Sequence, residues 1–150
     1  MPRLTTSTVG TSTTDRVMGH RLLQAWENLK DAFAGPSATL PPHLREEVRR
    51  TLPQRTGCQF CASLGQPAVT HTDRQEPLAV AFADAVARDH TAISDAQVQL
   101  LFEEFTAPQI VELLMWISFE YAGQMFGCLI GDEPATAEEK QAFAASIANA

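Results

Sequence analysis

The segment 110–130 reads IVELLMWISFEYAGQMFGCLI and decides the fold class of this chain. Wound as an α-helix it is apolar on nearly every side, and a helix without a polar face is buried on all faces. Thr106 is a good N-cap for this helix, and Pro108 suits its first turn. In a chain of 150 residues, the pattern predicts a central core helix, a subunit interface, or both.

Shorter helical patterns precede and follow this segment. A helix from about Asp15 stops at Gly35-Pro36, and its apolar face is formed by Met18, Leu22, Trp26, Leu29 and Phe33. A second helix begins at Pro42 and is expected to kink or end at Pro53, because a proline inside a helix removes a hydrogen bond. Further helices are expected over about 74–89, after the N-cap Ser94, and after the capping box of Thr136 and Glu139.

The pattern as a whole is helical. No stretch alternates apolar and polar residues over five or more positions with β-branched enrichment, and no repeat occurs at solenoid periods. We therefore expect an all-α fold, an orthogonal bundle of six to seven helices. Residues 15–150 are expected to form a single domain, and residues 1–14 an N-terminal arm rich in Thr and Ser.

Charge and composition exclude several classes of protein. The net charge of −7 disfavours a nucleic-acid partner, because phosphates attract clustered Lys and Arg. The richest basic cluster, between Arg45 and Arg55, is interleaved with Glu46 and Glu47 and is typical of a mixed-sign helix face. No apolar run reaches about 18 residues, and the N-terminus lacks an apolar signal region. We expect a cytoplasmic protein that binds neither nucleic acid nor membrane.

The phrase Gly57-Cys58-Gln59-Phe60-Cys61 carries the most specific chemistry in the chain. Two thiols separated by two residues at a helix start can form a disulfide with little backbone movement. The free N–H groups and positive dipole at a helix start stabilise a thiolate. Lowering a thiol pKa from about 8.5 to about 7 raises its ionised fraction at neutral pH by about tenfold. Such a dithiol can attack a peroxide or a disulfide and then resolve internally.

Other interpretations of the cysteines stay open. Free cysteines are commonly buried as small apolar residues, and Cys128 in the apolar segment is expected to be inert packing. A zinc site would require Cys128, His71 and His90 to converge on the pair, because the chain has no second C-x-x-C and no close histidine pair. A thioredoxin-type motif is excluded, because no βαβ pattern accompanies it.

The context of the cysteines resembles the alkylhydroperoxidase D and carboxymuconolactone decarboxylase superfamily. The resemblance rests on Leu44-Arg45-Glu46, then eleven residues, then Cys58-x-x-Cys61 on consecutive helices. His20 and the helix beginning near Gln109 also match the general layout of that family. The similarity covers about residues 15–131 and implies an alkylhydroperoxidase D-like bundle.

The resemblance implies roles for individual residues. Cys61 would attack the peroxide, Cys58 would resolve the sulfenic acid as a disulfide, and Glu46 would relay protons. An external dithiol of the dihydrolipoamide or thioredoxin type would donate electrons to a homo-oligomer, with no cofactor and no metal. Helix-dipole reasoning alone favours Cys58 as the attacking thiol, because it lies nearer the helix start.

The chain departs from the family at the relay histidine, whose position holds Gly65, and Phe60 stands where some members have a second histidine. General acid–base help is worth roughly 10²–10⁴-fold, so peroxidase activity is expected to be weak unless another group relays protons. His71 is one candidate relay. Glu47 is another, because it flanks the inward stripe of its helix whereas Glu46 lies opposite and can pair with Arg50.

Three functions follow from these residues. The first is a thiol-dependent antioxidant peroxidase or disulfide reductase. The second is the lactone decarboxylase branch, which needs a proton donor and acceptor rather than a dithiol. The third is a non-enzymatic oligomeric binding or redox-sensor protein of the same fold.

Overall fold

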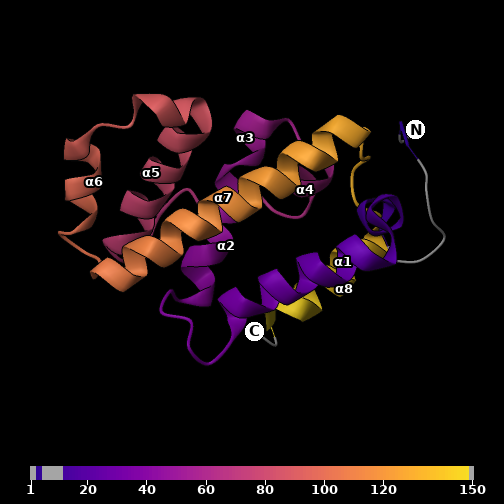
Figure 1. Ribbon diagram of the computed structural model, residues 1–150, viewed down its shortest axis with the longest axis horizontal. Helices are drawn as coiled ribbons and strands as arrows, with labels where there is room; N and C mark the ends of the chain where they lie inside the picture. Colours follow the sequence, from indigo (N-terminus) through magenta and orange to yellow (C-terminus); the bar gives the residue numbers. More distant parts are fainter. Residues whose placement is uncertain (1–2, 5–11, 149–150) are drawn as a thin grey trace.

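The computed structural model describes residues 3–4 and 12–148, in which every regular element is helical (Figure 1). The all-α fold class predicted from the sequence is confirmed. The predicted N-terminal arm, 1–14, lies mostly outside the described residues. In chain order the elements are α1 (Thr13–Ala34), α2 (Pro42–Thr51), α3 (Pro53–Thr56), α4 (Gln59–Ser63), α5 (Gln75–Asp89), the 3-10 turn η1 (His90–Ala92), α6 (Asp95–Leu101), α7 (Ala107–Ile130) and α8 (Ala137–Ala148).

The core lies where α2, α5 and α7 pack together. The stripe Leu44, Val48 and Leu52, predicted to point inward, is fully buried. It meets Leu113 and Ile117 of α7 in one apolar cluster that also includes Ala79 and Phe82 of α5. Each buried leucine or isoleucine contributes about 1.5–3 kcal/mol of transfer free energy. Helix α7 runs diagonally through the bundle (Figure 1) and contacts α1, α2, α3, α4 and α5.

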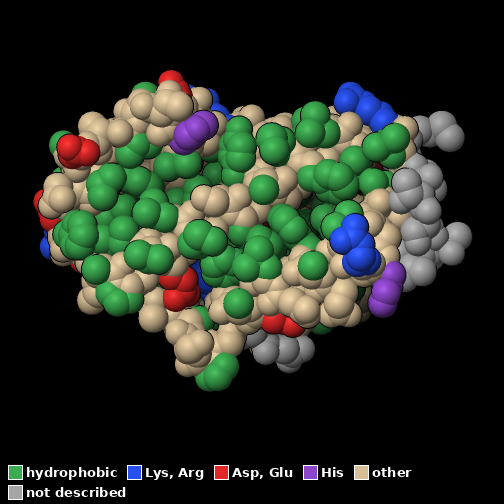
Figure 2. All heavy atoms as spheres, in the orientation of Figure 1, with side chains coloured by type: hydrophobic (Ala, Val, Ile, Leu, Met, Phe, Trp, Pro, Cys, Tyr) green, Lys and Arg blue, Asp and Glu red, His purple; other side chains and the backbone are tan. Residues whose placement is uncertain are grey.

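Of the two alternatives predicted for segment 110–130, the central core helix is confirmed, whereas burial at a subunit interface stays a prediction. One face of α7 carries core residues, and the opposite face exposes Val111, Leu114, Met115, Met125 and Leu129. Figure 2 shows apolar side chains gathered over α7 and its neighbours. By length and composition α7 could also cross a membrane, with 39% of its most apolar window buried, but core helices of soluble proteins pass the same test.

Helix α1 also differs from its predicted form. Gly19 has non-helical angles (φ 70°, ψ 167°) and kinks the helix. Of the five residues predicted to share one apolar face, only Phe33 is buried, whereas Leu22 and Leu29 are exposed. Trp26 stacks on Phe119 with ring centroids 4.2 Å apart and so joins α1 to α7.

Two helix ends, one before Pro53 and one at Gly57, place the cysteines at the start of the next helix, as predicted. Helix α2 ends at Thr51, and Pro53 begins the one-turn helix α3. Gly57 closes α3 in the left-handed conformation (φ 73°), which glycine adopts without steric cost. Cys58 is then the N-cap of α4, which packs against α7.

Candidate functional site

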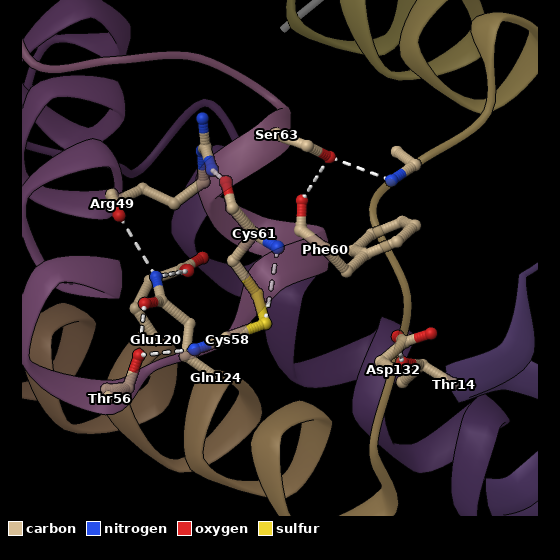
Figure 3. Close-up of a disulfide and its surroundings, with 11 residues drawn as sticks. Thr14, Arg49, Thr56, Cys58, Phe60, Cys61, Ser63, Glu120, Gln124 and Asp132 are labelled. Carbon is tan, nitrogen blue, oxygen red and sulfur yellow. Dashed lines mark hydrogen bonds between the residues drawn. A yellow bond between two sulfur atoms is a disulfide. The ribbon is translucent and has the colours of Figure 1, made fainter. Parts of the chain in front are cut away.

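Cys58 and Cys61 form a disulfide in the structure, with their Cα atoms 5.3 Å apart. The backbone N–H of Cys61 donates a hydrogen bond to Cys58 Sγ over 3.2 Å, so the α4 start points at this sulfur (Figure 3). The two residues differ in access: Cys58 is 1% exposed, whereas Cys61 is partly exposed and lines a cavity. The accessible member of the pair is therefore Cys61.

The cavity beside Cys61 has a volume of about 190 Å³ and is walled by α1, α2, α4, α7 and α8. Its apolar walls are mainly aromatic, with Trp26, Phe60, Phe119 and Phe143 joined by Met18 and Leu64. Its polar wall includes Arg49, Glu120 and Gln124. Gly123 leaves the room that Trp26 occupies, because a Cβ there would lie 2.7 Å from its ring. The result is a small apolar cavity with a charged end next to a disulfide.

Glu120 is one of three carboxylates that line this cavity with Cys61; the other two, Asp15 and Glu27, come from α1. Although the Glu120 side chain keeps some contact with the cavity, its carboxyl group is surrounded by protein. This burial raises the pKa of Glu120 from 4.5 to about 7, while Arg49 and the hydrogen bond from Gln124 oppose the rise. A group with that pKa exists in both protonation states near neutral pH and can accept or donate a proton.

Gln124 connects Glu120 to the cysteine turn. It is 2% exposed, and its Nε2 donates to the carbonyl of Arg49 at 2.9 Å and to Glu120 Oε2 at 3.4 Å. Its Oε1 accepts a hydrogen bond from Thr56 Oγ1 at 3.1 Å, and Thr56 Oγ1 accepts from the backbone N–H of Cys58 (Figure 3). These bonds hold the carboxyl and the disulfide in fixed relative positions.

Arg49 is the buried cation of the site, 5% exposed, and Lys30 of α1 also lines the cavity. Arg49 Nη1 donates to the carbonyl of Cys61 at 3.2 Å. Its guanidinium lies 4.8 Å from the centre of the Phe143 ring, a cation–π contact that brings α8 over the cavity. A hydrogen bond from the N–H of Ala135 to Ser63 Oγ ties the segment before α8 to α4.

Glu46, the predicted relay acid, does not line the cavity beside Cys61. It lies behind Arg49 in a neighbouring recess, where it accepts hydrogen bonds from Arg49 Nε at 2.7 Å and Arg50 Nε at 2.8 Å. Its side chain is only 11% exposed, so the solvated surface position expected from the helical wheel is wrong. In this position Glu46 fixes the Arg49 guanidinium.

The two reserve relays are also placed away from the cavity. Glu47 is buried, pairs with Arg50 and accepts a hydrogen bond from the N–H of Ala68 at 2.8 Å. His71 Nδ1 lies 3.3 Å from Glu76 Oε2. Neither residue lines the cavity that Cys61 lines.

Gly65 shows why the histidine of the resembled family has no place in this chain. Its φ of +149° is one that residues with side chains rarely adopt, and a Cβ there would lie 3.0 Å from Arg50 Nε. Arg49 Nη2 would lie 3.7 Å from the same Cβ. Two guanidinium groups therefore border the position where the imidazole would begin.

Cys128 is a free, exposed cysteine on α7, so the prediction that it is inert core packing is wrong. A Cβ added to Gly57 would lie 3.6 Å from its Sγ, which places this third thiol near the cysteine turn. Within the part of the chain that the structure describes, no cysteine belongs to a cluster of metal-ligating groups. The convergence of Cys128, His71 and His90 on the cysteine pair is not observed there.

Glu120 is the site residue that sequence reasoning missed. It matches no motif, and its partner cysteine is 59 positions away (120 minus 61). One signal was present: Glu120 is one of only two carboxylates in the largely apolar segment 110–130, the other being Glu112, and a carboxylate is costly to bury unless it is paired or functional.

Comparisons with known proteins bear on the fold. No family model matches the chain, and no curated protein matches it. Among solved structures it is similar to an uncharacterized peroxidase-related protein from Silicibacter sp. TM1040, with a TM-score of 0.71 and 16% identity over 83% of this chain and 75% of the other. The fold is therefore shared with a peroxidase-related protein and agrees with the alkylhydroperoxidase D-like bundle predicted from the cysteine context.

Proposed function

We propose that this chain is a thiol-dependent oxidoreductase of the alkylhydroperoxidase D type, which reduces a small organic hydroperoxide through Cys61 and Cys58. One observation carries the proposal. The accessible cysteine of a disulfide-forming pair lines an apolar cavity together with a carboxyl group whose pKa is about 7. The cavity of about 190 Å³ suits a substrate with a short apolar tail.

In the oxidative half of the reaction, Glu120 accepts the proton of the Cys61 thiol. The thiolate attacks one peroxide oxygen, the O–O bond breaks, and Cys61 becomes a sulfenic acid. Glu120 returns the proton to the departing alkoxide, which leaves as an alcohol. The Cys58 thiol then attacks the Cys61 sulfur, and the sulfenic oxygen leaves as water. Two thiols are oxidised to one disulfide while the peroxide is reduced to alcohol and water.

In the reductive half, an external dithiol of the dihydrolipoamide or thioredoxin type restores the pair. Its thiolate attacks Cys61, the accessible sulfur, and Cys58 leaves as a thiolate. The N–H of Cys61 points at Cys58 Sγ and stabilises this charge, and a stabilised leaving thiolate speeds disulfide exchange. The second donor thiol then closes its own disulfide and releases reduced Cys61.

This assignment resolves the disagreement between the two sequence arguments. The helix start stabilises the thiolate form of Cys58, as the helix-dipole argument expects. Because Cys58 is buried, it suits the role of the resolving thiol and of the leaving group in reduction. Cys61 has the access that an attacking thiol needs. Glu120 supplies the proton relay that Gly65 cannot.

The test compares three serine variants during peroxide consumption with a dihydrolipoamide-type donor. Cys61→Ser should abolish turnover. Cys58→Ser should allow one oxidation per chain and accumulate a sulfenic acid at Cys61, detected by dimedone labelling and mass spectrometry. The matched control, Cys128→Ser, should retain wild-type turnover.

Two outcomes would contradict the proposal. Dimedone labelling of Cys58 in a Cys61→Ser variant would reverse the roles of the two thiols. A wild-type chain that oxidises once but is reduced by no dithiol donor would instead be a redox sensor, the non-enzymatic alternative.

A further inference from the structure

A second group of ionisable side chains lies outside the cysteine cavity. It combines His43 near the start of α2, His71 and Asp73 from the segment between α4 and α5, and Glu76 from the first turn of α5. His43 Nε2 lies 3.4 Å from Asp73 Oδ2 and 3.5 Å from Glu76 Oε1. The three potential ligand atoms of His43, Asp73 and Glu76 all lie within 4.8 Å of one another.

Glu76 makes this group unlike an ordinary surface cluster. It is 5% exposed, and among the described residues the side chains that contact its carboxylate are the imidazoles of His43 and His71. A buried carboxylate needs a compensating charge. A divalent ion bound between Glu76, Asp73 and His43 would supply that charge.

The two distances from His43 Nε2 to the carboxylate oxygens of Asp73 and Glu76 fit a small divalent ion. Tetrahedral zinc with nitrogen and oxygen ligands at about 2.0–2.2 Å places those atoms about 3.3–3.5 Å apart. The distances of 3.4 and 3.5 Å from His43 Nε2 lie in this range. The mixture of one imidazole and two carboxylates favours zinc and similar transition-metal ions.

The surrounding contacts orient the candidate ligands. The backbone N–H of Glu76 donates to Asp73 Oδ1 at 2.9 Å, which leaves Oδ2 to face His43. His71 Nδ1 lies 3.3 Å from Glu76 Oε2, the oxygen that does not face His43. A hydrogen bond from a neighbouring group to a ligating carboxylate is the usual outer support of a metal site.

We propose that His43, Asp73 and Glu76 bind a divalent transition-metal ion of the zinc type, with His71 orienting the Glu76 carboxylate. Three protein ligands leave a fourth position, and His43 and Glu76 also line an open cleft through which water or a small anion can reach it. Bound metal joins the segment before α5 to α2, the helix that carries Glu46 and Arg49. The site is independent of the cysteine chemistry.

The test measures zinc binding by titration calorimetry with Cys58 and Cys61 oxidised and Cys128 replaced by serine, so that no thiol competes for the metal. The chain should bind one zinc ion, and His43→Ala should abolish saturable binding. His71→Ala should weaken binding by about 10–100-fold, the usual cost of losing an outer partner. His90→Ala, which removes an exposed histidine elsewhere, should bind as tightly as the parent chain.

Glu76→Gln should also abolish zinc binding, but Glu76 is buried and this variant can fail to fold. His43 is exposed, so His43→Ala should stay folded and tests whether zinc binds at this site in either case. Circular dichroism checks the fold of each variant. Tetrahedral cobalt absorbance of the parent chain, lost in His43→Ala, should accompany zinc binding. Absence of saturable binding by the parent chain, or affinity within tenfold of it in His43→Ala, would overturn the proposal.

Discussion

At the scale of one residue, the buried position of Glu120 determines the pH dependence expected for the proposed reaction. The reactive state holds one proton between Cys61 and Glu120, so a fully protonated pair cannot react. Because burial places the pKa of Glu120 at about 7, peroxide reduction by the wild-type chain should increase as pH rises through about 7. The rise reports an apparent pKa of the pair, since the two groups titrate together.

Glu120→Gln removes the relay and leaves Cys61 to ionise alone. The rise in kcat/KM should then move towards the ordinary thiol pKa of about 8.5, and activity at neutral pH should fall by about 100-fold or more. Initial rates of peroxide consumption, measured from about pH 5 to about pH 9, report both the shift of the pH profile and the loss of activity. Glu103→Gln, at an exposed site outside the cavity, is the matched control. An unchanged pH profile in Glu120→Gln would rule out the relay.

The residue scale also shows what local sequence can predict. The C-x-x-C spacing and the preceding glycine predicted a disulfide-forming pair at a helix start, because that geometry is set within a few residues. Glu120 could not be predicted in the same way. Its partner is distant in sequence, and its pKa depends on burial that only the assembled helices create.

At the scale of elements, the loop after α4 has a backbone conformation at Gly65 that residues with side chains rarely adopt. Introducing the histidine of the resembled family by Gly65→His should destabilise the chain by about 1–3 kcal/mol, because a side chain is strained at a φ of +149° and meets Arg50. Chemical denaturation measures the loss. Peroxidase activity should not rise, because the guanidinium groups occupy the space that the imidazole needs.

Gly65→Ala separates the two causes. It introduces the same backbone strain without an imidazole, so it should lose a similar amount of stability. The contrary result would be a Gly65→His variant that is more active than the wild type while Gly65→Ala is not. It would show that the wild-type chain lacks a proton relay, and that Glu120 does not supply one.

The element boundaries were readable where proline, glycine and capping residues set them. Pro53 ends α2 as predicted, and Ser94 and Thr106 form capping boxes at the starts of α6 and α7. The path of α1 was not readable, because one apolar stripe spans Gly19 without showing that the backbone turns there. Periodicity predicts which residues share a face only while the helix stays regular.

At the scale of the whole molecule, the outer face of α7 carries a stripe of exposed apolar side chains. This face consists of Val111, Leu114, Met115, Met125 and Leu129. At 100° per residue these positions form one stripe along the helix, opposite the stripe that fills the core. Contiguous exposed apolar surface of this kind marks an interaction site. The homo-oligomer predicted from the sequence therefore remains our prediction, with a second copy of the chain covering this face.

Sedimentation across a concentration series should show wild-type association that Met115→Glu weakens. Placing a carboxylate at the centre of an apolar contact should raise the dissociation constant at least about tenfold, which corresponds to 1.4 kcal/mol. Val69→Glu is the matched control, because Val69 is 99% exposed and lies outside the stripe. If the wild type is a monomer throughout, or if Met115→Glu associates as strongly as Val69→Glu, the outer face of α7 does not bind a second copy. None of the five outer-face residues lines the cysteine cavity, so Met115→Glu should leave turnover per chain unchanged even when it separates the subunits.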